Sequence, residues 1–254
     1  MARPVRSTPD YASWVPSRLV YVPAALAVIL GGLSALTLWL ALPAFLCFAG
    51  ASYFAYARWT LSARGGDVQS KIQALVLQHL HWPGSGDVLD IGCGNGQLAI
   101  AIAKAYPRAR VTGVDFWGKS WEYSRAACER NAAVEGVAKQ LTFRRASAAQ
   151  LPFPGGTFDV VVSNLVFHEV RDVADKKLLL QEALRVLKTG GAFVLQDLFL
   201  WSRVYGSVPD LLTAISGWGI SSVAFAATNE AAFIPAALKL PFMVGTIGIV
   251  HGTK

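Results

Sequence analysis

The segment from Asp90 to Gly96, which reads DIGCGNG, has the residue spacing most informative about chemistry. Glycine lets a backbone turn sharply and approach a ligand closely. Dinucleotide-binding folds use the spacing GxGxxG and direct a helix N-terminus at a pyrophosphate. Here Gly92, Gly94 and Gly96 alternate with other residues and follow the carboxylate of Asp90, which suits a cationic or amine-bearing ligand better than a pyrophosphate. The alternative is a glycine turn that serves tight packing alone.

A second acidic residue, Asp115, follows the next predicted strand. An acidic side chain at that position can accept hydrogen bonds from both hydroxyls of a ribose. Phe116 and Trp117 come next, and either ring can form an apolar wall for an adenine. The alternatives are a helix N-cap for Asp115 and ordinary core packing for the two aromatic residues.

His168 and Glu169 lie beyond the fourth predicted strand and are the candidates for proton transfer. Histidine titrates near neutrality, so His168 suits the removal of a proton from a substrate. The alternatives are that His168 caps the following helix or only lines the cavity, and that Glu169 pairs with a nearby Lys or Arg. The other histidines and the three cysteines have no metal-ligand spacing, so we predict no metal site.

These residues need a scaffold, and the chain around them alternates predicted strands and helices. Near-continuous apolar strands indicate a parallel sheet covered on both faces, and such sheets bind ligands at the carboxyl ends of their strands. Two late strands predict an antiparallel edge. The predicted strands are 88–91, 110–114, 141–145, 158–163, 192–198, 220–226 and 244–251. The predicted helices are 68–81, 97–105, 122–135, 172–187, 209–218 and 231–240, with Gly190-Gly191 as the C-cap of the fourth.

Four segments, VLDIGCGNGQLAI, VTGVDFW, LPFPGGTFDVVVSNLVFHEV and EALRVLKTGGAFVLQDLF, follow one another along the chain. In order and spacing they resemble the successive motifs of class I methyltransferases that depend on S-adenosylmethionine (SAM). The resemblance is to the branch with quinone-biosynthesis and small-molecule enzymes. It covers about residues 68–200 strongly and the tail loosely. It implies a Rossmann-like, doubly wound α/β sheet and SAM as the cofactor.

The resemblance also implies a role for individual residues. The methionine and ribose part of SAM would be held by Asp90, Gly92, Gly94 and Gly96. Asp115 would bind the ribose hydroxyls, Phe116 would lie against the adenine, and Asn164 would line the site near the methyl donor. One position departs from the family pattern, because an Asp that often contacts the adenine amino group is here Ser147. The hydroxyl of Ser147 or the backbone amide of Ala148 is expected to replace that contact.

From Leu19 to Ala57 the chain has 39 consecutive residues without Asp, Glu, Lys, Arg or His. One membrane-spanning helix needs about 20 apolar residues, so this run predicts a transmembrane helical hairpin with its turn near Leu40 to Pro43. Basic residues on both sides favour two crossings and cytoplasmic flanks. The alternatives are one long tilted span or a helical pair within one leaflet. The predicted division is a membrane anchor at residues 1–64 and a methyltransferase domain at residues 65–254, on the cytoplasmic side.

Charged residues make up only 15% of the chain, and the formal net charge is +7. No Lys/Arg-rich run with interleaved aromatic residues occurs, which disfavours nucleic acid as a partner. The hairpin, which would contact membrane lipids, and an apolar tail predict a small hydrophobic or membrane-dissolved acceptor: a phenol or quinone, a lipid amine or a thiol. Three alternatives stay open: a non-catalytic SAM-binding membrane protein, an NAD-dependent Rossmann oxidoreductase, and a nucleic-acid methyltransferase.

Overall fold

The computed structural model describes residues 8–118 and 121–254, and the chain forms two compact units. The first unit contains the described residues 8–11 together with Lys71–Gly118 and Tyr123–Lys254. The second contains Ala12–Ser70 and the short segment that ends at Glu122. Along the chain, the second unit therefore extends a few residues beyond the boundary that composition predicts at residue 65.

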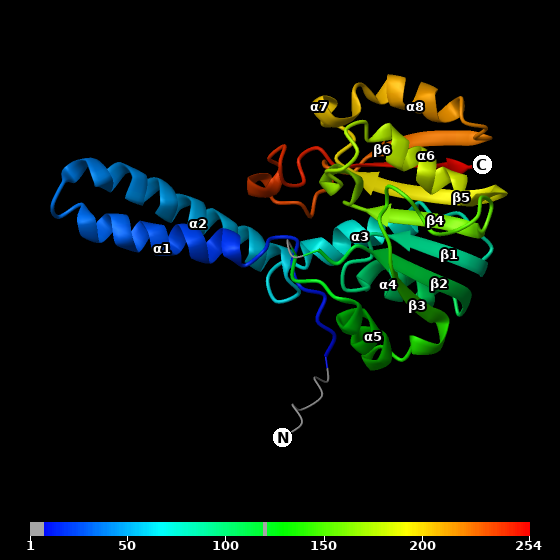
Figure 1. The fold of residues 1–254 in the computed structure, drawn as a ribbon, viewed down its shortest axis with the longest axis horizontal. Helices are drawn as coiled ribbons and strands as arrows, with labels where there is room; N and C mark the ends of the chain where they lie inside the picture. Colours follow the sequence, from blue (N-terminus) through cyan, green and yellow to red (C-terminus); the bar gives the residue numbers. More distant parts are fainter. Residues whose placement is uncertain (1–7, 119–120) are drawn as a thin grey trace. The chain divides into compact units, whose positions relative to one another are not determined.

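The second unit is built on a helical hairpin (Figure 1). Its elements are helix α1 at Arg18–Leu33, the 3-10 turn η1 at Leu38–Leu40, and helix α2 at Ala41–Leu61. The predicted pair of helices is present, but the predicted turn near Leu40 to Pro43 is wrong, because the chain turns at residues 34–37. Pro43 lies instead in the first turn of α2, where a residue without an N–H loses no helical hydrogen bond.

The surface of this hairpin is apolar. Among the described helices, the segment Leu38–Leu61 is the one that is long and apolar enough to cross a membrane, and α1 is apolar but shorter. At the tip, Leu36 and Trp39 have 84% and 90% of their surface exposed. Contiguous exposed apolar surface of this kind is typical of a contact with a membrane or with another protein.

The first unit is a seven-stranded sheet with the strand order β3-β2-β1-β4-β5-β7-β6. Only β7 runs antiparallel to its neighbours β5 and β6, so the mostly parallel sheet with an antiparallel edge is confirmed. The strand order reverses between β1 and β4, and open α/β sheets bind their ligands at the carboxyl ends of the strands at such a reversal. The strands are β1 Ser85–Ile91, β2 Arg108–Asp115, β3 Leu141–Arg145, β4 Phe158–Asn164, β5 Leu187–Asp197, β6 Ser222–Ala227 and β7 Gly248–Thr253.

Helices cover both faces of this sheet, and each face has its own apolar core. Because successive side chains of a strand point to opposite faces, Leu89 and Ile91 pack with α6 and α8, whereas Val88 packs with α4 and α5. Burial on both faces explains why the strands are almost continuously apolar. The helices are α3 Val68–Gln78, α4 Gln97–Ala105, α5 Arg125–Val134, α6 Lys177–Arg185, α7 Ser202–Tyr205 and α8 Val208–Ser216; short 3-10 turns are η2 Ala138–Gln140, η3 Phe167–Glu169 and η4 Ala236–Leu238.

Two local predictions are wrong. The expected helix at residues 231–240 is only the short turn η4, because Pro235 interrupts the apolar run and disfavours helix in the residue before it. Gly190-Gly191 lies inside β5 and does not cap a helix. A Cβ on Gly191 would lie 2.9 Å from the carbonyl oxygen of Asp159, so the glycine lets β5 pass close to β4.

Helices α5 and α6 begin later than predicted, at Arg125 and Lys177. For α5 the cause is a local cap. The Oγ of Ser124 accepts a hydrogen bond from the backbone N–H of Ala127, at 3.2 Å, and this satisfies a donor that the first turn leaves open.

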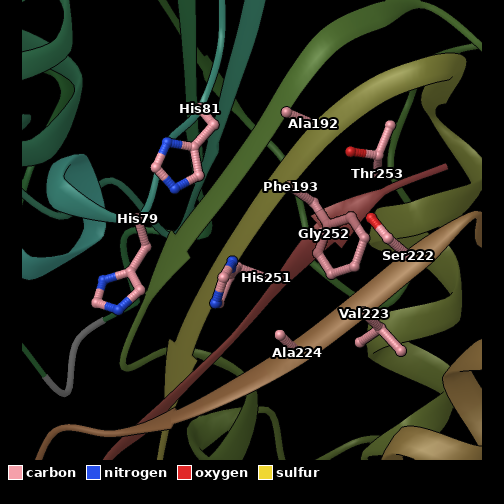
Figure 2. Close-up of a pocket in the computed structure, with 10 residues that line it drawn as sticks. All are labelled: His79, His81, Ala192, Phe193, Ser222, Val223, Ala224, His251, Gly252 and Thr253. Atoms are coloured by element: carbon pink, nitrogen blue, oxygen red, sulfur yellow. The ribbon is translucent and has the colours of Figure 1, made fainter.

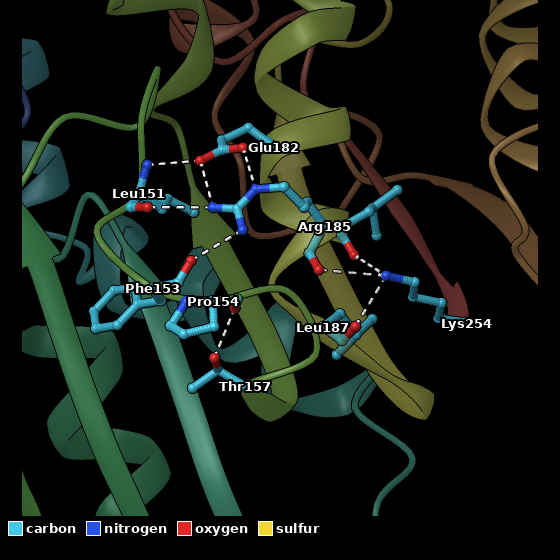
Figure 3. A network of polar contacts seen from close by, with 9 residues as sticks. Leu151, Phe153, Pro154, Thr157, Glu182, Arg185, Leu187 and Lys254 are labelled. Atoms are coloured by element: carbon cyan, nitrogen blue, oxygen red, sulfur yellow. Dashed lines mark hydrogen bonds and ion pairs between the residues drawn. The ribbon is translucent and has the colours of Figure 1, made fainter.

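A polar network at the end of α6 holds the loop that precedes β4 (Figure 3). The guanidinium of Arg185 donates to the carbonyl oxygens of Phe153 (2.9 Å) and Leu151 (3.2 Å) and pairs with Glu182 at 2.7 Å. The Oε1 of Glu182 accepts the N–H of Leu151 at 2.7 Å. This clamp fixes the Leu-Pro-Phe segment at residues 151–153, which begins three residues after Ala148 of the predicted cofactor site.

Candidate functional site: a cofactor cradle at the carboxyl ends of β1, β2 and β4

The glycine loop continues the pairing between β1 and β2. The N–H groups of Gly92 and Cys93 both donate to the carbonyl oxygen of Val114, at 2.7 and 3.0 Å. Gly92 has φ of +72°, and a Cβ there would lie 2.1 Å from the side chain of Val166. Gly94 and Gly96 also have positive φ, and Gly96 leads directly into α4. The spacing that the sequence presents is thus required by the backbone conformation of the loop.

Asp90 lies beneath this loop with 1% of its surface exposed. Burial raises the pKa of its carboxyl to about 7, although a hydrogen bond from the backbone of Ala99 opposes the shift. Its Oδ2 has no hydrogen-bond partner among the described residues. A buried carboxylate with an open oxygen is stabilised by a cation or an amine, and the amine-bearing, positively charged SAM fits that requirement.

Asp115 ties the end of β2 to the glycine loop. Its Oδ2 accepts the N–H of Gly94 at 2.9 Å and its Oδ1 accepts the N–H of Trp117 at 2.7 Å. Burial raises the pKa of Asp115, and these N–H groups limit the rise. An ionised carboxylate offers about four acceptor positions, so two ribose hydroxyls can still bind. Asp115 is not a helix N-cap, because α5 begins at Arg125.

The two aromatic residues after Asp115 take different positions. Phe116 is 58% exposed, and the guanidinium carbon of Arg145 lies 4.8 Å from the centre of its ring. Trp117 packs against the core of the α4 and α5 face, and its Nε1 donates to the carbonyl oxygen of Gly94 at 2.9 Å. Core packing therefore accounts for Trp117, and Phe116 is the ring left available to a ligand.

Ser147 and Ala148 lie in the turn after β3. The N–H of Ala146 donates to the carbonyl oxygen of Asp115 at 3.0 Å, which brings this turn to the end of β2. The Oγ of Ser147 accepts the N–H of Ala149 at 3.1 Å, so its proton can still be donated elsewhere. The structure thus brings the predicted substitutes for the missing Asp next to the predicted ribose site.

Buried polar side chains line the ends of β4 and β5. Asn164 is 8% exposed, and neither atom of its amide has a hydrogen-bond partner in the described part of the chain. It pairs in register with Gln196, which is fully buried and donates to the Oγ1 of Thr228 at 3.1 Å. The strand register places Asp90, Asn164 and Gln196 on the same face of the sheet. Such groups normally bind water or a ligand.

A second polar cluster, at the end of β5, centres on Asp197, which the sequence analysis did not single out. Asp197 ends β5 with no exposed surface. Its carboxylate accepts the N–H groups of Val166 (3.1 Å), Phe167 (2.8 Å) and Leu198 (2.7 Å), and its Oδ1 lies 2.6 Å from Nδ1 of His168. The available signal was weak: one acid at the end of an apolar strand, 29 residues after the histidine.

His168 lies between two carboxylates. Its Nε2 lies 3.5 Å from Oε1 of Glu169. The hydrogen bond from His168 lowers the pKa of Glu169, and the positive charges of His168 and of the neighbouring Arg171 lower it as well, against the effect of burial. Burial alone would lower the pKa of His168, but attraction to Asp197 and hydrogen bonds to both acids raise it to about 10. The ring is thus held protonated near neutrality. The role of His168 as a base stays a prediction. It requires the imidazole ring to lose a proton, although the carboxylates of Asp197 and Glu169 both stabilise its protonated form.

Residues 89–195 match the family model described as "Methyltransferase domain". Among curated proteins, the chain is 36% identical over 121 residues to the ubiquinone/menaquinone biosynthesis C-methyltransferase UbiE of Syntrophotalea carbinolica. That match covers 48% of this chain and 47% of the relative, so the chain spans about half the length of the curated relative.

Two solved structures share the fold. A geranyl diphosphate methyltransferase in complex with SAM has a TM-score of 0.56 at 17% identity, covering 78% of this chain and 89% of that one. The [4+2]-cyclase SpnF has a TM-score of 0.54 at 19% identity, covering 74% of this chain and 80% of that one. At these identities the likeness concerns the fold alone.

The ribose role of Asp115 predicts the effect of its removal. Asp115→Ala should weaken SAM binding, measured by calorimetry, by about tenfold to a hundredfold, since two hydrogen bonds to a charged group are lost. Asp115→Asn, which keeps one acceptor, should lose less. Asp87→Ala is the matched control, because Asp87 lies at the start of β1 and pairs with Arg110 on the surface. Unchanged affinity in Asp115→Ala would contradict the ribose role.

The pair of His168 with Asp197 predicts a pH-dependent stability. The folded-state pKa of His168, about 10, lies above its ordinary value of 6.5. The stabilisation is therefore complete below about pH 6.5 and is lost as the pH rises towards 10. Urea unfolding should show a gap between wild type and His168→Gln that narrows steadily from about pH 6 to pH 10. A gap that widens with pH would mean that the ring is neutral in the folded protein.

Proposed function

We propose that this chain, which carries a class I methyltransferase domain and uses SAM, transfers a methyl group to a small apolar acceptor of the phenol or quinone class. One observation carries the proposal. The buried carboxylate of Asp90 precedes the glycine loop and the partly buried carboxylate of Asp115 follows it, and Asp90 keeps one oxygen without a hydrogen-bond partner among the described residues. This charge arrangement suits a cationic nucleoside.

The chemistry asks little of the protein. SAM supplies, when bound, a methyl group already activated by a positively charged sulfur, so catalysis is mostly orientation. In the proposal Asp115 binds the ribose hydroxyls, Phe116 lies against the adenine, and Ser147 or Ala148 contacts the adenine edge. Asp90 balances the positive charge from beneath the loop. Asn164, at the end of β4, orients the donor end of the site.

A phenolic acceptor arrives with a proton that must leave before or during transfer. His168 and Glu169 are the proposed proton-handling pair, with Asp197 as the residue that positions the imidazole. Asp197 contacts Nδ1, so proton exchange with an acceptor would occur at Nε2, the nitrogen that faces Glu169. Because His168 is held protonated, the proposal entails that its contribution to turnover increases at alkaline pH.

The acceptor class rests on two supports. The relative from Syntrophotalea carbinolica is named for methylation in quinone biosynthesis. The hairpin of the second unit exposes apolar side chains such as Leu36 and Trp39, which suits a protein at a membrane, where quinones dissolve. We therefore propose that residues 1–64 are a membrane anchor, that the hairpin contacts lipids, and that the catalytic domain, from residue 65, faces the cytoplasm.

Two other functions were considered, a SAM-binding protein without methyl transfer and an NAD-dependent oxidoreductase, and different observations bear on each. The likeness to a [4+2]-cyclase keeps a SAM-binding protein without methyl transfer as the second candidate, because the fold alone does not determine the reaction. An NAD-dependent oxidoreductase is disfavoured by the match to a methyltransferase domain model. Direct competition between SAM and NAD in a binding assay separates the two cofactors.

Methyl transfer is tested with the full chain in mild detergent, methyl-labelled SAM and a membrane lipid extract. The expected result is label in an extractable apolar product together with S-adenosylhomocysteine. His168→Ala should keep SAM binding within about threefold while slowing turnover at least tenfold. Label found only in water-soluble products would reject the apolar acceptor, and no S-adenosylhomocysteine with any extract would favour the non-catalytic candidate.

The anchor is tested by flotation with phosphatidylcholine vesicles. The full chain should float with the vesicles, and so should a control with Leu178→Ala, an exposed position on α6 of the first unit. A variant with Leu36, Leu38 and Trp39 all changed to Ser should float less, because it removes apolar area at the hairpin tip. A full chain that does not float with the vesicles would contradict membrane attachment, and equal flotation of the wild type and the triple variant would contradict attachment through the hairpin tip.

A further inference from the structure

A network of three residues from distant parts of the chain, Asp10, Asn95 and Asn131, supports the glycine loop. Asn95 lies inside the loop, between Gly94 and Gly96, and Asn131 lies on α5. Both asparagines are buried, with 6% and 3% of their surface exposed. Asparagine is a weak helix former because its side chain competes for backbone hydrogen bonds. A buried asparagine within α5 therefore indicates a tertiary role.

The amide of Asn131 binds both backbone groups of Asp10. Its Oδ1 accepts the N–H of Asp10 at 2.9 Å, and its Nδ2 donates to the carbonyl oxygen of Asp10 at 2.9 Å. Nδ2 also donates to the carbonyl oxygen of Asn95, at 3.0 Å. The three bonds require this one orientation of the amide, because an N–H can only donate and a carbonyl can only accept. One side chain thus joins the segment before the hairpin to the glycine loop.

The side chain of Asn95 completes the network from the loop. Its Nδ2 donates to the carbonyl oxygen of Asp10 at 3.2 Å, and its Oδ1 accepts the N–H of Ser124, the N-cap of α5, at 3.0 Å. The carbonyl oxygen of Gly94 accepts a hydrogen bond from Sγ of Cys128, also on α5, at 3.1 Å. Two successive carbonyls of the loop are therefore held by α5, and the side chain between them is held by Asp10.

The next residue, Tyr11, attaches the same segment to the end of α5. Its hydroxyl donates to Oε1 of Glu135 at 3.2 Å, and its ring packs against the apolar core on the α4 and α5 face. Ala12 begins the second unit, and α1 begins at Arg18. The chain thus leaves the first unit directly after this attachment.

We propose that Asn131 and the backbone of Asp10 are positioning residues for the SAM loop. They act through Asn95, and they hold the loop in its binding conformation before the cofactor arrives. A preorganised loop loses less conformational entropy on binding, so the affinity for SAM should depend on this network. The inference rests on the proposed assignment of the glycine loop to SAM.

The test is SAM binding by the full chain in mild detergent, measured by calorimetry. Asn131→Ala removes three hydrogen bonds of the network, and Asp10→Pro removes the N–H that Asn131 accepts. Each variant should weaken SAM binding at least about fivefold. Thr8→Pro is the matched control, because it places a proline at an exposed residue of the same segment, and it should change the affinity by less than about twofold.

A second measurement separates positioning of the loop from general stability. Without SAM, hydrogen exchange of the amides at residues 92–96 should be at least about fivefold faster in Asn131→Ala and Asp10→Pro than in the wild type. Val137→Ala removes buried apolar atoms just beyond α5, and Val223→Ala removes apolar atoms beside a cavity at the β6 edge of the sheet (Figure 2). Both controls should lower the melting temperature and leave the exchange of the loop unchanged.

Asp10→Pro leaves the side chains of the core intact, so it keeps the test decisive if Asn131→Ala does not fold. Unchanged SAM affinity or unchanged loop exchange in both variants would overturn the positioning role, and so would an equal loss of affinity in Val137→Ala. Absence of SAM binding by the wild type would instead overturn the proposed function. The exchange measurement needs no cofactor, so the two failures are distinguishable.

Discussion

The extension of the β1–β2 pairing into the glycine loop is the interaction on which the site depends. Two N–H groups of the loop converge on the carbonyl oxygen of Val114, and the next available N–H, that of Gly94, reaches Asp115. One carboxylate thus holds the loop and remains open to a ribose. The loop needs glycine to adopt this conformation, because Gly92, Gly94 and Gly96 all have positive φ and Gly92 has no space for a side chain.

A second constraint comes from charge buried at the ends of β4 and β5. Asp197 has no exposed surface and stays ionised, since three N–H groups and His168 outweigh the effect of its burial on the pKa. Such a group is costly to bury unless each of its acceptor positions is used. The backbone N–H groups of Val166 and Phe167 therefore donate hydrogen bonds to Asp197, and these bonds fix the path of the loop after β4. Asn164, with no such partners, lies one residue beyond the buried Ser163 and faces the other side of the sheet.

These two centres differ in what they leave for chemistry. At Asp90 and Asn164, buried polar atoms lack protein partners among the described residues, so bound ligand or water must satisfy them. At Asp197 and His168 the polar atoms are paired with one another. The first centre is thus prepared to bind, whereas the second holds a proton and a loop in place. A methyl donor that is already activated requires little more than this division.

Much of the first unit is determined locally by sequence. Helix α4 and strand β3 match their predicted bounds. Gly96 precedes α4, and Pro107 follows two residues after its end. Asp90, the three glycines and Asp115 were recognisable because they lie at or just beyond the carboxyl ends of β1 and β2, and parallel strands bring such ends together. The antiparallel edge was expected because the two late strands depart from the simple alternation of strand and helix, and β7 is antiparallel to both of its neighbours. Where a run was apolar but lacked a period, as at residues 231–240, the prediction failed.

Three features depended on contacts between residues far apart in the chain. The partner of His168 is 29 residues away on another strand, and His251 meets His79 only because β7 inserts between β5 and β6. Likewise the Gly190-Gly191 pair has the composition of a helix cap, and the close passage of β5 by β4 makes it part of a strand. Sequence alone identified the cofactor loop, because positive φ values at three alternating positions call for glycine there. Only the tertiary structure decided which charges and imidazoles face one another, because strand order sets those neighbours and no local pattern encodes it.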